Sequence, residues 1–121
     1  MENKPFTHPI GRLPHESLHA YEVAREILAF VASRRGRFRG LPGELASHIE
    51  RSSVSTLMNV AEAAGRIATE EAASPSPKGE ACELAAALEA AHLFGTLGAE
   101  EHAHARGLLV RLTKRLARLA A

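Results

Sequence analysis

The chain has four stretches in which apolar residues recur every three or four positions, which is the spacing of one face of an α-helix. These stretches predict helices over residues 15–35, 42–71, 75–94 and 99–119. No stretch alternates apolar and polar residues as a β-strand would, and no internal repeat is visible. The pattern therefore predicts an all-α chain.

Each predicted helix has an inner face that identifies its candidate core residues. These faces comprise Leu18, Tyr21, Ala24, Leu28 and Val31; then Leu45, Ile49, Ser53, Leu57, Val60, Ala64 and Ile67; then Cys82, Ala85, Leu88, Ala91 and His92; and finally Leu108, Leu109, Leu112, Leu116 and Leu119. Short connections between successive helices favour antiparallel neighbours, so we expect an up-down four-helix bundle over residues 15–121. Residues 1–14 contain three prolines and no period, and they predict an extended arm.

Glycine and proline mark the predicted connections. The segment 36–43 contains three glycines and one proline, and we expect it to be a loop. Pro75 and Pro77 each follow a serine, a combination typical of a helix start, so the third helix is predicted to begin at one of them. Gly95 and Gly98 bracket the turn before the last helix.

Composition narrows the class of protein further. Aromatic residues make up 4% of the chain and Trp is absent, so the core must be aliphatic. The formal charge is +1, which does not imply attraction of nucleic acid by the molecule as a whole. A single cysteine excludes an internal disulfide, and no segment is apolar for long enough to span a bilayer. These features predict a soluble cytoplasmic protein with no membrane association.

Two groups of basic residues stand out against the balanced total charge. Four arginines crowd one segment, and four basic residues lie on one side of the last predicted helix; they are Arg34, Arg35, Arg37 and Arg39, and Arg111, Lys114, Arg115 and Arg118. Such side chains can contact phosphates, and Phe38 could stack on a base. Alternatively, both groups are solvated surfaces, with Phe38 packed on the end of the bundle.

A polar face runs along the second predicted helix. It consists of Arg51, Ser55, Asn59, Glu62 and Arg66. Steps of three and four residues keep these side chains on one side of the helix. They could link helices or line a subunit interface through hydrogen bonds, or they could form a polar binding groove.

The same face resembles a known family of four-helix bundle proteins. Its founding members are encoded within intervening sequences of ribosomal RNA genes, and it includes the accessory variability determinant of diversity-generating retroelements. The matching positions are Arg51, Ser55, Asn59, Ala61, Glu62, Gly65 and Arg66, with weaker matches at Tyr21, Gly79, Glu83, Leu84 and residues 93–97. The chain differs from the family pattern at Leu57 and Ala63, and in the prolines that open the third helix.

The resemblance implies a bacterial protein that assembles into a homopentameric ring. It also implies a partner, because the retroelement member binds a reverse transcriptase and nucleic acid through a basic surface. In a ring, a modest basic patch would repeat once per subunit and form a band, and repetition multiplies weak contacts.

Nothing in the sequence indicates an enzyme. There is no Asp, no Ser-His-Asp arrangement and no phosphate-binding glycine loop. His102 and His104 point to different sides of a helix, so we predict no metal site and no cofactor, and we assign Cys82 to the core. The resulting hypothesis is a non-catalytic, oligomeric accessory protein that binds RNA or DNA, possible partners including a reverse transcriptase. The alternative is a protein–protein adaptor without a nucleic-acid role.

Overall fold

The structure of the protein, a computed structural model, describes residues 18–69 and 77–120. Its elements are α1 (His19–Ser33), α2 (Arg35–Phe38), α3 (Leu45–Thr69), α4 (Pro77–Leu93) and α5 (Ala99–Ala120). The described residues form helices and connecting turns with no strand, which confirms the all-α prediction. The predicted arm over residues 1–14, and the predicted helix residues 15–17, 70–71 and 75–76, lie outside the described part. None of the described helices is long and apolar enough to cross a membrane.

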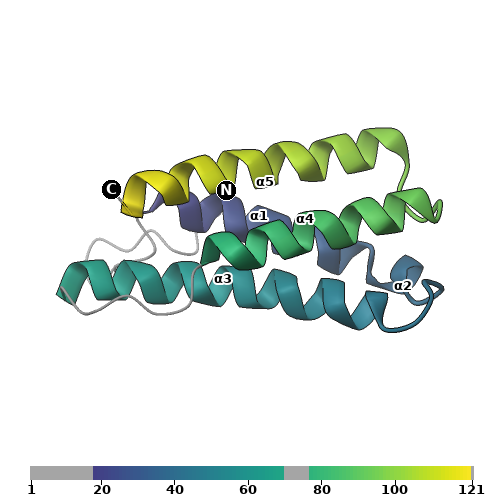
Figure 1. Ribbon diagram of the computed structural model, residues 1–121, viewed down its shortest axis with the longest axis horizontal. Helices are drawn as coiled ribbons and strands as arrows, with labels where there is room; N and C mark the ends of the chain where they lie inside the picture. Colours follow the sequence, from purple (N-terminus) through teal and green to yellow (C-terminus); the bar gives the residue numbers. More distant parts are fainter. Residues whose placement is uncertain (1–17, 70–76, 121) are drawn as a thin grey trace, which may run out of the picture.

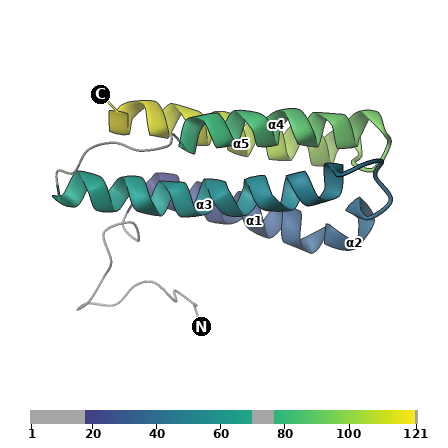
Figure 2. The same ribbon diagram turned by 60° about the horizontal axis from the view of Figure 1, so that its bottom comes forward.

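The four long helices lie side by side (Figure 1). α1 packs against α3 and α5, and α4 packs against the same two helices from the other side. Figure 2 shows the short helix α2 at one end of the molecule, where the chain passes from α1 to α3. The α4–α5 turn lies at this same end, whereas α5 finishes at the opposite end (Figure 1).

The predicted loop over residues 36–43 contains a helical turn. α1 ends at Ser33, two residues before its predicted end, because Arg34 leaves the helical conformation with φ −114° and ψ 10°. α2 follows directly and buries Phe38, whose exposed fraction is only 2%. Gly43 then adopts φ 59°, a left-handed conformation that favours glycine, and α3 begins two residues later.

The core is aliphatic, as the composition predicts. Its largest fully buried side chains include Ile27, Ile49, Leu84, Leu88, Leu97 and Leu112. α3 also turns small hydroxyl groups inward at Ser52, Ser53 and Thr56. The hydroxyl of Ser53 donates to the carbonyl of Glu50 at 2.9 Å, and that of Thr56 donates to the carbonyl of Ser52 at 2.8 Å. Because these bonds stay within α3, both hydroxyls are buried without leaving a polar group unpaired.

The predicted inner face of α4 is confirmed at Leu88 and Ala91, which are buried, and wrong at Cys82, which is exposed. Ala81 and Leu84 are buried in addition. Alanine occurs on every side of α4, so the sequence pattern alone does not separate Ala81 from Cys82.

The predicted inner face of α1 is confirmed at Ala24 and Val31. Val23 and Ile27 are buried as well, while Tyr21 is only partly buried.

Truncation of a core leucine tests this packing. We expect Leu84→Ala to lower the free energy of unfolding by about 2–5 kcal/mol, because it removes buried methyl groups and leaves a cavity. Leu93→Ala is the matched control in the same helix; its side chain is 77% exposed, so its effect should stay within about 0.5 kcal/mol. Urea denaturation followed by circular dichroism measures both changes, and equal effects would contradict the orientation of α4.

Candidate nucleic-acid interface

Glu101 joins three segments at the α2 end of the molecule. Its carboxylate accepts hydrogen bonds from Arg34 Nε at 2.9 Å, and from Arg37 Nη1 and Nη2 at 2.6 and 2.7 Å. It also accepts the backbone N–H of Gly98 at 3.0 Å. Gly98 caps α5, since its carbonyl accepts the N–H of His102, so Glu101 closes a capping interaction as well as two ion pairs.

This arrangement uses two of the four clustered arginines for structure. Arg34 Nη1 also donates to the carbonyl of Phe30, and its guanidinium lies 3.8 Å from the centre of the Phe30 ring. Arg37 Nη2 donates to the carbonyl of Thr96 at 2.7 Å. The hydrogen bonds from Arg37, Gly98 and Arg34 hold the pKa of Glu101 far below its usual range, and the same carboxylate raises the pKa of Arg37. The charge of both arginines is therefore partly offset.

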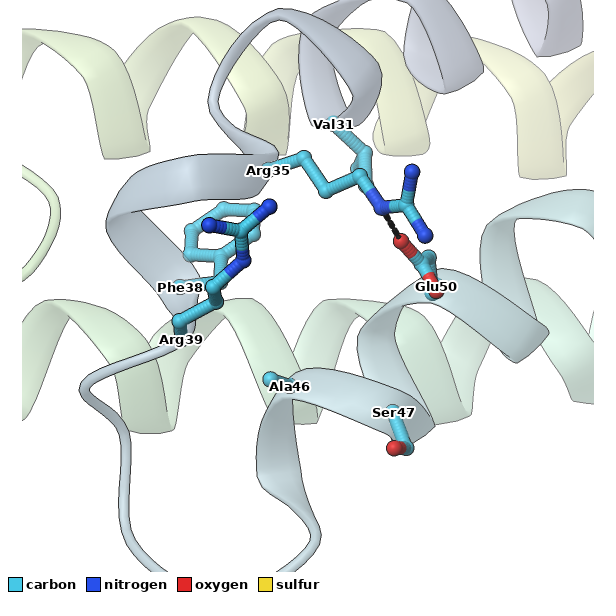
Figure 3. Close-up of a pocket in the computed structure, with 7 residues that line it drawn as sticks. All are labelled: Val31, Arg35, Phe38, Arg39, Ala46, Ser47 and Glu50. Atoms are coloured by element: carbon cyan, nitrogen blue, oxygen red, sulfur yellow. Dashed lines mark ion pairs between the residues drawn. The ribbon is translucent and has the colours of Figure 1, made fainter.

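The other two clustered arginines border a pocket between α1, α2 and the start of α3 (Figure 3). The pocket has a volume of about 170 Å³, and Val31, Phe38 and Ala46 form its apolar lining. Arg35 pairs with Glu50 across it, and Ser47 lies nearby on α3. Arg39 is exposed and forms no ion pair with the described residues. Of the two alternatives for Phe38, stacking on a base is wrong and packing on the end of the bundle is confirmed, because its ring is buried and lines this pocket.

The basic residues of α5 form the second group, here called the α5 stripe: Arg111, Lys114, Arg115 and Arg118. Arg115 is partly buried and the other three are exposed. Arg111 Nη1 lies 4.0 Å from a carboxylate oxygen of Glu26 on α1, which is the limit of an ion pair. The remaining three form no ion pair with the described residues, so the α5 stripe keeps most of its charge available.

The two basic groups lie far apart in the structure. Glu101, which holds Arg34 and Arg37, is ten residues before Arg111 and seventeen before Arg118 on α5. At 1.5 Å per residue these separations are about 15 Å and 26 Å along the helix axis. The α5 stripe therefore lies toward the opposite end of the molecule from α2 (Figure 1).

The predicted polar face of α3 lies on or near the surface where the structure describes it. Arg51 and Glu62 are exposed, whereas Ser55 and Asn59 are partly buried. The side chain of Arg66 is outside the described part. Val54 and Met58 lie beside this face and are 41% and 63% exposed. The outer surface of α3 thus combines polar side chains with an apolar pair.

The histidines of the described part of the chain lie in separate places. His102 stacks on His92 with 4.7 Å between ring centres, while His104 lies against Phe30. The described residues contain no group of three or more His, Cys, Asp or Glu side chains that could hold a metal ion.

Sequence analysis missed two residues of this end of the molecule. Glu101 stands three residues after Gly98, a spacing that signals a helix cap, but its arginine partners are more than sixty residues away in the chain. Phe94 entered the prediction as the last residue of the helix over 75–94, yet it is 63% exposed.

Comparison with protein-family models, with curated proteins and with solved structures gives no significant match. The family resemblance therefore remains a hypothesis that rests on the helix residues quoted for it.

The low pKa of Glu101 predicts an acid-dependent loss of stability. Because the folded state binds the proton less readily than the unfolded state, this carboxylate stabilises the fold above the usual glutamate pKa of about 4.3, and the contribution disappears as the pH falls below it. Glu101→Gln should lower the melting temperature at pH 7, and the difference from the wild type should shrink as the pH is lowered. A difference that stays constant between pH 7 and pH 3 would contradict this role.

Proposed function

We propose that the protein is a non-catalytic accessory protein that binds RNA or DNA through the α5 stripe. The observation that supports this proposal is the charge of α5, which contains no acidic residue after Glu101. Within the described residues, the stripe forms one ion pair, between Arg111 and Glu26 at 4.0 Å. Because few carboxylates pair with these cations, their charge favours binding of an anionic polymer such as RNA or DNA.

The expected contacts are to phosphates. Arg and Lys side chains that neutralise phosphates release counterions, so the affinity depends steeply on salt. Such contacts position the nucleic acid without selecting a sequence. At the other end of the molecule, Arg39 can join because it has no ion pair with the described residues, whereas Arg34, Arg35 and Arg37 would first have to give up their glutamate partners.

We further propose that the four long helices form an up-down four-helix bundle that assembles into a homo-oligomeric ring. The family resemblance suggests a pentamer. The exposed Val54 and Met58, one turn apart on α3, provide an apolar contact beside the polar face that begins with Arg51. Assembly would repeat the α5 stripe once per subunit and strengthen weak phosphate contacts.

The resemblance also suggests the setting. We propose a cytoplasmic protein that acts with a reverse transcriptase or another nucleic-acid enzyme. The competing hypothesis is a protein–protein adaptor, and the partial neutralisation of the arginines around α2 favours it. The adaptor would show no salt-dependent binding to any RNA or DNA.

Removal of the α5 stripe tests nucleic-acid binding. The fourfold variant Arg111→Ala, Lys114→Ala, Arg115→Ala and Arg118→Ala should weaken binding to a labelled single strand. It should also flatten the plot of log affinity against log salt by up to about 3, since each phosphate contact contributes about 0.7 to the slope. Fluorescence anisotropy at several salt concentrations measures both quantities.

A pair of double variants controls for total charge. Arg111→Ala with Arg115→Ala removes two charges from the stripe, and Arg25→Ala with Arg106→Ala removes two exposed charges elsewhere. We expect only the first pair to change the salt slope. Equal effects, or none, would disprove the assignment of the stripe.

Substitution on the outer surface of α3 tests assembly. Met58→Glu places a charge where the proposed contact is apolar, so it should shift the protein toward the monomer in sedimentation equilibrium. Because Met58 is 63% exposed, the helical content should be unchanged. Glu89→Gln, an exposed change on α4 away from this surface, serves as the control. A wild-type protein that is already monomeric would contradict the proposal.

A further inference from the structure

The α4–α5 turn presents an aromatic ring to solvent. Phe94 is 63% exposed, whereas Phe30 and Phe38 are 6% and 2% exposed and Tyr21 is partly buried. Among the described Phe and Tyr residues, Phe94 is thus the only one with an exposed ring. The other rings are used for packing, and this one is not.

The backbone that carries Phe94 is held firmly. Gly95 adopts φ 85°, its N–H donates to the carbonyl of His92 at 2.9 Å, and the N–H of Thr96 donates to the carbonyl of Ala91 at 3.0 Å. These two bonds form a Schellman motif, which ends α4 at Leu93, directly before Phe94. Arg37 adds a bond to the carbonyl of Thr96. A fixed backbone lowers the entropy lost when a ligand covers the ring.

The size of the apolar surface indicates what kind of ligand fits. Leu93 is exposed beside Phe94, but the other exposed large hydrophobic residues of the described part lie elsewhere, with Val54 and Met58 on α3. Val110 is eleven residues into α5, about 16 Å along its axis. A stable protein interface needs roughly 800 Å² from each partner, far more than two side chains provide. A single ring, by contrast, is enough to stack on one nucleobase.

The chemistry around the ring suits a nucleic acid. Arg37, on α2, reaches this turn by donating to the carbonyl of Thr96, and its side chain remains 48% exposed while it is also bonded to Glu101. Aromatic rings beside arginines are a common arrangement in proteins that bind single strands. Unpaired bases are required, because in a duplex both faces of each base are already stacked.

We propose that Phe94 stacks on an unpaired base of single-stranded RNA or DNA. This inference rests on the proposed function and adds the strandedness of the ligand. The α5 stripe supplies the salt-dependent attraction, and Phe94 supplies a contact that depends little on salt. The two contributions can therefore be measured separately.

The first test compares Phe94→Ala with the wild type for a labelled oligodeoxyadenylate. We expect about a tenfold loss of affinity and an unchanged salt slope. Binding of the same strand paired with oligodeoxythymidylate should be unaffected. Leu93→Ala, the neighbouring exposed apolar residue, is the matched control and should bind both forms as the wild type does.

The second test observes the stacking directly. The chain has no Trp, so Phe94→Trp introduces a single indole at this turn. Its fluorescence should be quenched when oligodeoxyadenylate binds, and the quenching should saturate together with the anisotropy of the labelled strand.

The outcomes separate this inference from the proposed function. Salt-dependent binding with no quenching and no loss in Phe94→Ala would overturn the stacking and leave the role of the α5 stripe intact. An absence of any binding would overturn both. A Phe94→Ala variant that keeps full affinity for the strand but loses a co-purifying protein would assign Phe94 to protein docking instead.

Discussion

One carboxylate organises the end of the molecule where α1, α2 and the α4–α5 turn meet. Glu101 binds Arg34 and Arg37 and also caps its own helix through the N–H of Gly98. Through Arg37 it is connected to Thr96, in the turn that presents Phe94. Because Glu101 pairs with Arg34 and Arg37, these two arginines stabilise the fold, whereas Arg39 forms no ion pair with the described residues. Together with Glu50, which pairs with Arg35, Glu101 offsets two of the four positive charges of this arginine-rich segment.

The helices themselves could be predicted because their residues follow a local period. The inner face of α5, from Leu108 to Leu116, agrees with the pattern of leucines. In α4 the prediction holds at Leu88 and Ala91 but fails at Cys82, because alanine occurs on all sides of this helix and packing against other helices buries Ala81 instead. α2 was missed because a single turn has no period. It forms where the buried Phe38 packs against the start of α3.

The candidate interface was predictable only where it depends on one helix. The α5 stripe follows from spacing alone, and the structure leaves three of its four side chains exposed. The arginines around α2 could not be interpreted from the sequence, because their partners, Glu50 and Glu101, are brought to them by the tertiary fold. The two groups of cations looked equivalent in the sequence, and they differ in how much charge remains uncompensated. For Phe38 the structure confirms the alternative of packing on the end of the bundle, because its ring is buried, whereas no pattern in the sequence indicates that Phe94 is exposed.

We propose that copies of this chain assemble and bind nucleic acid through the repeated α5 stripe. Light scattering of the wild-type protein, alone and with a single-stranded oligonucleotide, should be measured at low and at moderate salt. We expect an oligomer whose mass increases when the strand is added at low salt, with the added mass lost as the salt is raised. A monomer whose mass is unchanged by the strand at either salt concentration would contradict it.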